Sequence, residues 1–490
     1  MEIFKSPVVN QALVAVGVLS TMLSCGLSLG YTAAYMDSQK TTDDVLPDGL
    51  KTIETCGEFA FIPAIIFIPV TMQRKGRRIA SYATTVPLLL SWIISYYSNN
   101  QAVLLVNSLQ NFALGGAVST SSVTISEYCS PQSRGAILML ETAMISLGVL
   151  ISHVFGMYSH WRLISFLGFV SSFTALFASL FWLESPYWLV SEGQIMRGTE
   201  TFYWLRGFSD EACKELDAVQ MLHKVKSQMQ ALKPVKRMHL RQQIKDFIKS
   251  LLNADFLRPL SIMILLFSFV GFGGENVTAS SSYHDVFKLT YGKYIGTIIL
   301  DVLSLVCSLI ACVLIHIVRR KTLFIFTGSC SLVFLAVTSL VLFLQTFDMF
   351  SQEYVWLILT FSTGFAMFMS LGTTALPLSL LGEMFPMSYK GVGCSLTCAY
   401  LWAFGKSILK NIPFLTRSLG LPTFTLIALI FMIVILIVLN KIMPETYMKS
   451  IVEIEHIVNK KHERKEYKSV NVTDENETDA FDKIKLFLQV

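Results

Sequence analysis

Long apolar stretches recur along nearly the whole chain, with short polar connections between them. A helix needs about 20 apolar residues to cross a bilayer core about 30 Å thick, and its backbone groups have to bond within the helix itself. The pattern therefore predicts an all-α membrane protein with twelve spanning helices. They are expected at 11–35, 54–72, 79–98, 101–126, 136–158, 162–183, 258–282, 294–317, 322–346, 354–382, 391–412 and 420–440. The first stretch is too long for the apolar region of a signal peptide, so we expect it to remain as a helix.

Two longer polar segments, 184–256 and 444–490, divide the chain. We expect one bundle of six helices in 1–183 and a second in 257–443. A cytoplasmic loop with short helices then joins the bundles, and a cytoplasmic tail follows them. The second half of the loop is strongly basic, and two interpretations are open. It is either attracted to anionic lipid of the inner leaflet or is a linker that its charge keeps on one side of the membrane.

Basic residues gather in alternate loops between the predicted helices. They are Arg74, Lys75, Arg77, Arg78, Arg134, Arg319, Arg320, Lys321 and Lys390, whereas Asp37, Asp43, Asp44 and Asp48 make the loop after the first helix acidic. Short loops rich in Lys and Arg stay on the cytoplasmic side of a membrane. We therefore expect a multi-pass protein of the plasma membrane with both termini in the cytoplasm.

Composition points the same way. The chain is 53% hydrophobic and only 15% charged, against about 25% charged residues in soluble proteins. Nine cysteines lie mostly within apolar stretches, without metal-ligand spacing, and are interpreted as small buried side chains. The hydroxyl clusters Ser119–Ser122 and Ser280–Ser282 have no His and carboxylate arranged for catalysis and are typical of close helix packing. We expect no enzymatic activity, cofactor, metal or nucleic-acid partner.

The chain contains an internal repeat. Glu127 is followed by a proline, by Arg134 seven residues later and then by glycine; Glu383 is followed in the same way by a proline, Lys390 and glycine. A basic turn lies two helices before each acid and an acidic turn two helices after it. These turns are Gly76-Arg77-Arg78 and Arg319-Arg320-Lys321, then Glu184-Ser185-Pro186 and Pro444-Glu445-Thr446. Repeated halves of this kind place the transport path at their interface.

The repeated charges suggest gates. Ion pairs across helix ends can close the cytoplasmic side and release it, provided that the two states differ by only a few kcal/mol. Partly hydrated pairs, worth about 1 kcal/mol each, suit this role. The predicted clusters are Glu127 with Arg134 and Arg78, and Glu383 with Lys390 and Arg320; Arg77, Glu184 and Glu445 complete the predicted gating set. The alternative is that these charges only set topology and cap helix ends.

Several motifs resemble those of the sugar porter branch of the major facilitator superfamily, and of its facilitated trehalose and glucose transporters in particular. They are Ser126-Glu127 to Arg134-Gly135, Trp161-Arg162, Glu184-Ser185-Pro186-Tyr187-Trp188-Leu189, Trp204-Leu205-Arg206-Gly207, Gly382-Glu383-Met384-Phe385-Pro386 and Pro444-Glu445-Thr446. The resemblance implies two pseudo-symmetric six-helix bundles in a monomer. It also implies facilitated transport of a sugar such as trehalose or glucose by alternating access.

Other positions depart from that family. The sugar-binding Gln of its fifth helix is Thr142 here, and the Gln pair of its seventh helix reads Val270 and Gly271. The Asn-Trp pair of its eleventh helix reads Leu401-Trp402. Amide groups supply paired donors and acceptors for sugar hydroxyls, and each lost hydrogen bond costs about 0.5–1.5 kcal/mol. The gates therefore resemble the family more than the sugar site does.

Ionisable residues inside the predicted helices are costly and usually functional. They are Glu58, Glu141, His153, Glu275, Asp301 and Lys406. Our hypothesis is that Glu275, Asn276, Trp402 and Lys406 edge the transport path, with Glu275 or Glu141 as the partner of Lys406. The alternative is that Lys406 reaches the membrane surface and that the acids lie near helix ends.

Thr32 bears on the driving force. Proton-coupled sugar porters carry an Asp at this place, so its replacement predicts passive, uncoupled transport. The leading hypothesis is a facilitative carrier of a sugar or related polyol. A relative that binds or senses a ligand, a carrier of another small polar solute and a channel stay open as alternatives.

Overall fold

The computed structural model describes residues 6–38, 57–97, 102–158, 160–231, 252–273, 295–346, 355–449, 453–455 and 457. Within them the chain is helical and contains no strand. The first half consists of α1 (Pro7–Ser38), α3 (Phe61–Lys75), α4 (Arg77–Tyr97), α5 (Val103–Tyr128), α6 (Pro131–Met157) and α7 (Trp161–Phe181). The second half consists of α12 (Ala254–Gly273), α15 (Ile295–Ile317), α16 (Arg320–Thr346), α17 (Val355–Phe368) continued by α18 (Ala375–Met384), α19 (Lys390–Leu419) and α20 (Leu421–Ile442).

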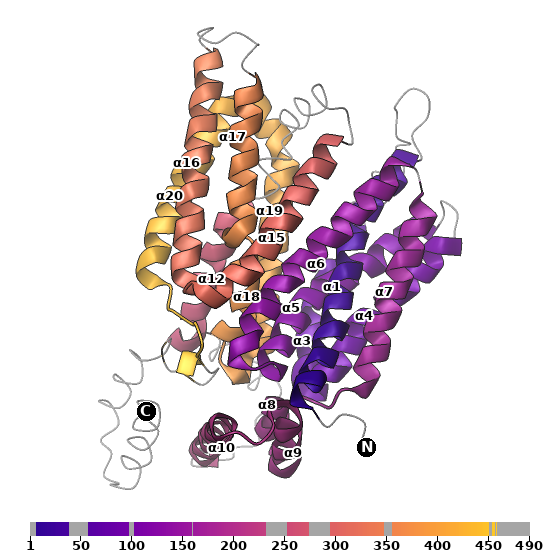
Figure 1. Ribbon diagram of the computed structural model, residues 1–490, viewed down its shortest axis with the longest axis vertical. Helices are drawn as coiled ribbons and strands as arrows, with labels where there is room; N and C mark the ends of the chain where they lie inside the picture. Colours follow the sequence, from indigo (N-terminus) through magenta and orange to yellow (C-terminus); the bar gives the residue numbers. More distant parts are fainter. Residues whose placement is uncertain are drawn as a thin grey trace.

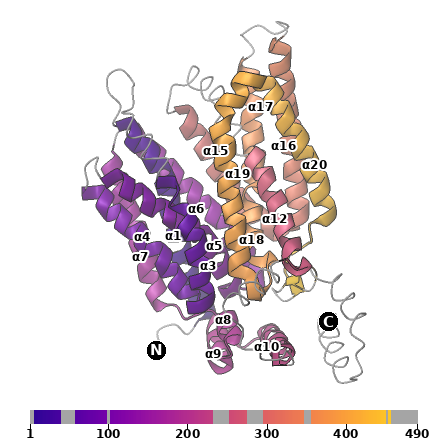
Figure 2. The ribbon, with the colours of Figure 1, turned by 180° about the vertical axis from the view of Figure 1, so that it is seen from behind.

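The two halves stand side by side as bundles that meet at one end and diverge toward the other (Figures 1 and 2). Three further helices, α8 (Pro186–Ser191), α9 (Ile195–Arg206) and α10 (Asp210–Ala231), lie beneath the end where the bundles meet. We call this end the inner end and the opposite one the outer end. The arrangement confirms the predicted fold class of two six-helix bundles.

In the part of the chain that the structure describes, ten helices are long and apolar enough to cross a membrane. The other two members of the bundles are α3, with 15 residues, and α5, in which the polar run Ser119–Ser122 interrupts the apolar sequence. α17 and α18 form one kinked span through a π-helical turn, Met369–Thr373. The kink has a local cause, because Pro377 lacks an amide hydrogen and its ring would clash with the carbonyl of Thr373 in a regular helix.

Glycines allow the closest helix contacts. A Cβ on Gly26 of α1 would lie 2.2 Å from the carbonyl oxygen of Ile145 in α6. A Cβ on Gly382 of α18 would lie 2.1 Å from the carbonyl oxygen of Ser122 in α5, so the backbones of the two halves touch there. Just beyond this second contact come the repeated acids of α5 and α18.

Candidate transport gates and solute site

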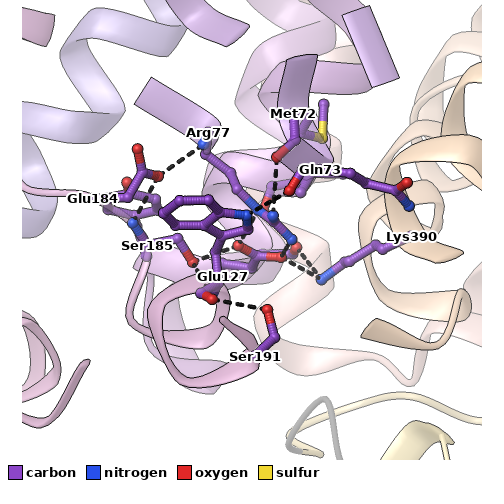
Figure 3. Close-up of polar contacts among 12 residues, drawn as sticks. Met72, Gln73, Arg77, Glu127, Glu184, Ser185, Ser191 and Lys390 are labelled. Carbon is purple, nitrogen blue, oxygen red and sulfur yellow. Dashed lines mark hydrogen bonds and ion pairs between the residues drawn. The ribbon is translucent and has the colours of Figure 1, made fainter. Parts of the chain in front are cut away.

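Glu127 lies in the last turn of α5 and is almost completely buried. Its carboxylate receives two hydrogen bonds from Arg77, the first residue of α4, with Nε–Oε2 and Nη2–Oε1 distances of 2.8 and 2.9 Å. The Ser185 hydroxyl also donates to Oε2. This bidentate pair joins two helices of the same half (Figure 3), and such fork-shaped contacts fix geometry as well as charge.

Lys390 reaches the same carboxylate from the other half of the molecule. It is the first residue of α19, and its Nζ lies 3.8 Å from Glu127 Oε1 and donates to Ser126 Oγ at 2.8 Å. Figure 3 shows the lysine entering from the opposite side of the site to Arg77. Glu127 therefore bonds within its own half and across the interface at once.

Glu383 makes the equivalent contacts, with the two halves exchanged. Within its half it pairs with Arg320, the first residue of α16, and across the interface it pairs with Arg134 of α6, whose Nε lies 2.7 Å from Oε1. Arg320 Nη1 also donates to Thr446 Oγ1 at 3.1 Å, so Thr446 contacts the arginine of its half, whereas Ser185 contacts the acid of its own. We call Glu127, Glu383 and their four basic partners the inner charge cluster.

The predicted grouping of these charges was right for Arg320, which pairs with Glu383, and wrong for the other three bases. Arg134 pairs with Glu383 instead of Glu127, and Lys390 pairs with Glu127 instead of Glu383. The reason is that each base begins the helix after the acid, and that helix turns its first residues toward the opposite half. Arg78 also has another role, since it donates to Tyr82 and to the carbonyls of Ser179 and Leu180, which ties α4 to α7.

The predicted hydration of these pairs was wrong as well. The side chains of Arg134, Glu383, Lys390 and Glu127 are no more than 1% exposed. A buried pair has a large attraction, but the cost of removing both charges from water cancels most of it. Opening the inner end would return the charges to water, so deep burial remains compatible with two states of similar free energy.

Glu184 and Glu445 act at helix ends. Glu184 accepts hydrogen bonds from the backbone amides of Arg77 and Arg78, at 2.7 and 3.3 Å, at the start of α4. Glu445 accepts one from the amide of Lys321, at 3.3 Å, at the start of α16. Burial raises the pKa of the Glu184 carboxyl above its ordinary value, while the amides that bond to it oppose this shift. For these two acids the capping interpretation matches the geometry.

A different set of contacts joins the halves toward the outer end. Lys406 of α19 forms an ion pair with Glu58, just before α3, and their side chains are 45% and 24% exposed. Nearby, the rings of Phe61 and Trp402 stack with centroids 4.9 Å apart and planes 12° from parallel. Lys406 therefore does not pair with Glu141, and that prediction was wrong. Glu275, the other predicted partner, and Asn276 lie outside the described residues.

Two further predicted charges also pair across the interface. His153 Nδ1 of α6 lies 2.6 Å from Asp301 Oδ2 of α15, and both side chains are partly exposed. The sequence indicated each of these residues but not their contact, because they are 148 positions apart.

Several buried polar atoms of the helices at the interface have no hydrogen-bond partner. Among the described residues these include Thr142 Oγ1, Trp402 Nε1, Ser395 Oγ and Glu141 Oε1. The other carboxylate oxygen of Glu141 accepts one hydrogen bond, from Ser121 Oγ at 3.2 Å. Such groups cost free energy when left unpaired. They are therefore candidates to bind a polar solute, and Thr142 and Trp402 were predicted for that role.

Comparison with known proteins places this architecture. The chain matches the model of the "Sugar (and other) transporter" family over residues 56–458. The facilitated trehalose transporter Tret1 of Apis mellifera ligustica is 27% identical over 472 residues, which cover 93% of this chain and 89% of that protein. Tret1 of Anopheles gambiae is 26% identical over 461 residues, and these cover 91% of this chain but 56% of the longer mosquito protein.

A solved structure agrees in fold. The proton:xylose symporter XylE, bound to 6-bromo-6-deoxy-D-glucose, superposes with a TM-score of 0.74 at 16% identity, covering 92% of this chain and 98% of that one. The two-bundle architecture is thus that of the major facilitator superfamily. The family model spans most of the chain and includes both repeated acids, Glu127 and Glu383. This multi-pass membrane protein therefore belongs to the sugar (and other) transporter family.

Proposed function

We propose that the protein is a facilitative transporter of a sugar such as trehalose or glucose, working by alternating access. The observation that carries the proposal is the reciprocal crossing of Arg134 to Glu383 and Lys390 to Glu127. Each half supplies an acid and a base to the other, so separating the inner ends breaks both contacts together. The names of the trehalose-transporting relatives support the substrate class.

The cycle follows from these contacts. With the inner charge cluster closed, solute reaches the site from the outer end, where the Glu58–Lys406 pair is partly hydrated and weak. The outer contacts part to admit the solute and form again over it, and the inner contacts then part. The pairs Arg77–Glu127 and Arg320–Glu383 stay within their halves and keep each acid paired and oriented throughout.

The proposed orientation places the inner end, both termini and α8–α10 in the cytoplasm of a monomeric carrier in the plasma membrane. The distribution of basic loops supports it. Thr32 supports uncoupled transport, because this place on α1 offers no carboxylate for a proton.

Tracer flux in proteoliposomes tests the proposal, with glucose, trehalose, polyols and organic anions as probes. We expect saturable, downhill exchange of at least one sugar, unchanged by an imposed proton gradient. Glu127→Gln should suppress net uptake while purified protein still binds the same sugar. Absence of sugar flux would refute the transport proposal, and accumulation driven by the proton gradient would refute uncoupled transport.

A second candidate is a protein that binds or senses a ligand and transports little. The observation that favours it is the altered solute site, where Thr142 and Gly271 stand in place of amide side chains. A sugar-induced rise in the unfolding temperature without tracer flux would favour this candidate over the first.

A further inference from the structure

The membrane-facing surface between α3 and α4 contains a groove of about 420 Å³ near the inner end. Its upper wall is apolar and exposed, with Phe67 and Val70 on α3. Ile79, in the first turn of α4, adds an exposed apolar side chain near the turn that joins the two helices. Its lower end is cationic, because Arg74 and Lys75 line it from the last turn of α3. The groove thus combines apolar walls with a cationic end.

The dimensions suit a lipid. Phe67 lies seven residues before Arg74, which is about 10 Å along a helix at about 1.5 Å per residue. The cations therefore sit at the level of the headgroups, and the apolar walls sit at the level of the first methylene groups of the acyl chains. Tyr82 of α4 also lines the groove, and its hydroxyl donates a hydrogen bond to the Ser179 carbonyl of α7.

The two cations have no acid of their own. Neither Arg74 nor Lys75 forms an ion pair with a described residue. The carboxylate of Glu184 lies beside Gly76 of this turn, but it is directed to the backbone amides of Arg77 and Arg78. An anionic group from outside the protein would therefore find uncompensated positive charge.

The second half of the chain offers an internal comparison. Arg77 and Arg320 occupy equivalent places, since each pairs with the repeated acid of its own half. Counting back from them, Arg74 and Lys75 correspond to Ile317 and Val318, and Ile317 is 74% exposed. The turn between such helices therefore forms without cations at these places, so Arg74 and Lys75 are not needed to form the turn.

We propose that the groove between α3 and α4 is a binding site for an anionic phospholipid of the inner-end leaflet. Arg74 and Lys75 bind the phosphate-containing headgroup, and Phe67 and Val70 contact the first part of an acyl chain. The bound headgroup lies one turn of chain from Arg77, which holds Glu127 in the inner charge cluster. The proposal depends on the membrane location, which the family establishes, and not on the identity of the solute.

Native mass spectrometry of the purified full chain tests the site, with phosphatidylglycerol and phosphatidylcholine of matched acyl chains as probes. We expect preferential retention of phosphatidylglycerol. Each Lys or Arg near an anionic surface contributes about 1 kcal/mol, so Arg74→Gln with Lys75→Gln should reduce this preference about thirtyfold. The double variant should fold, because both side chains are exposed.

The matched control is Arg197→Gln with Lys214→Gln, which removes two exposed cations from the loop helices α9 and α10. This control should keep the preference. An equal loss in the control would show diffuse attraction, and no loss in the Arg74 and Lys75 variant would place the lipid elsewhere; either result overturns the proposal. Soluble glycerol phosphate should not displace the lipid at equal concentration, and full displacement would refute a lipid site. None of these readouts depends on solute flux.

Discussion

Arg134 and Glu383 belong to opposite halves of the molecule, yet their Nε and Oε1 atoms lie 2.7 Å apart and both side chains are fully buried. Lys390 and Glu127 repeat the relationship with the halves exchanged. A contact of this kind exists only while the inner end is closed. The pairs within each half, in contrast, survive any rigid movement of one half against the other, so the two classes of pair should respond differently to mutation.

Arg134→Gln should shift the protein toward the state that is open at the inner end. Glu383 would keep Arg320, but the closed state would lose one crossing contact and leave part of a buried carboxylate uncompensated. Cys394 is a natural reporter, because it is fully buried one turn after Lys390 on α19. We expect its alkylation in the purified protein, followed by peptide mass spectrometry, to accelerate about tenfold or more.

Arg206→Gln is the control for this measurement. It removes an arginine from a pair with Glu215, which joins the loop helices α9 and α10 without crossing the interface of the halves. Its alkylation rate at Cys394 should equal that of the unchanged protein. Equal rates for all three proteins would contradict a gate at Arg134.

Arg77→Gln should mainly lower stability, whereas Lys390→Gln should mainly alter transport. Arg77 makes the bidentate pair that fixes α4 to α5 in every state, and removing one partner of a buried pair costs about 3–5 kcal/mol. Lys390 contacts Glu127 at 3.8 Å and only when the inner end is closed. We expect a fall of several degrees in the unfolding temperature for Arg77→Gln and a smaller fall, with a changed ratio of influx to efflux rates, for Lys390→Gln. The reverse order of unfolding temperatures would contradict this assignment.

The sequence was a good guide to the cluster's members and a poor guide to their partners. The duplicated spacing from Glu127 to Arg134 and from Glu383 to Lys390 identified four of its residues, because a repeat is visible within one chain. The crossing of the bases was not visible, since it depends on how each following helix is rotated in the folded bundle. The sequence spacing of an acid and a base gives no information about that rotation.

The long-range contacts at the outer end could not be predicted from the sequence either. Lys406 and Glu58 each stood out as a charge in an apolar stretch, but they are 348 positions apart and no local pattern joins them. The stacking partner of Trp402 was missed for a different reason. Phe61 is one of 35 phenylalanines, and in a membrane protein most of these face lipid or fill the core without special meaning.

Lys406→Glu should abolish most uptake without lowering the amount of protein at the membrane. The substitution would place two carboxylates in contact at the outer end, where like charges repel and keep the halves apart. Adding Glu58→Lys in the same chain restores opposite charges with the order exchanged, and we expect it to recover much of the uptake. Lack of recovery, with both variants normally expressed, would show that Lys406 acts through another partner.

Trp402→Phe should separate the two roles that the structure gives to this indole. The phenyl ring can still stack on Phe61, which is parallel to the indole within 12°, but it has no N–H. The Nε1 atom of Trp402 is buried without a partner among the described residues, so it is available to a solute oxygen. Losing one such hydrogen bond costs about 0.5–1.5 kcal/mol, which predicts a KM for sugar uptake raised about threefold to tenfold with little change in maximal rate.

Trp402→Ala would also remove the stacking contact between the halves and should lower the maximal rate as well. If Trp402→Phe transported like the unchanged protein while Trp402→Ala failed, the indole would serve only to close the outer end, and the solute would have to bind through Thr142 and Ser395 without it.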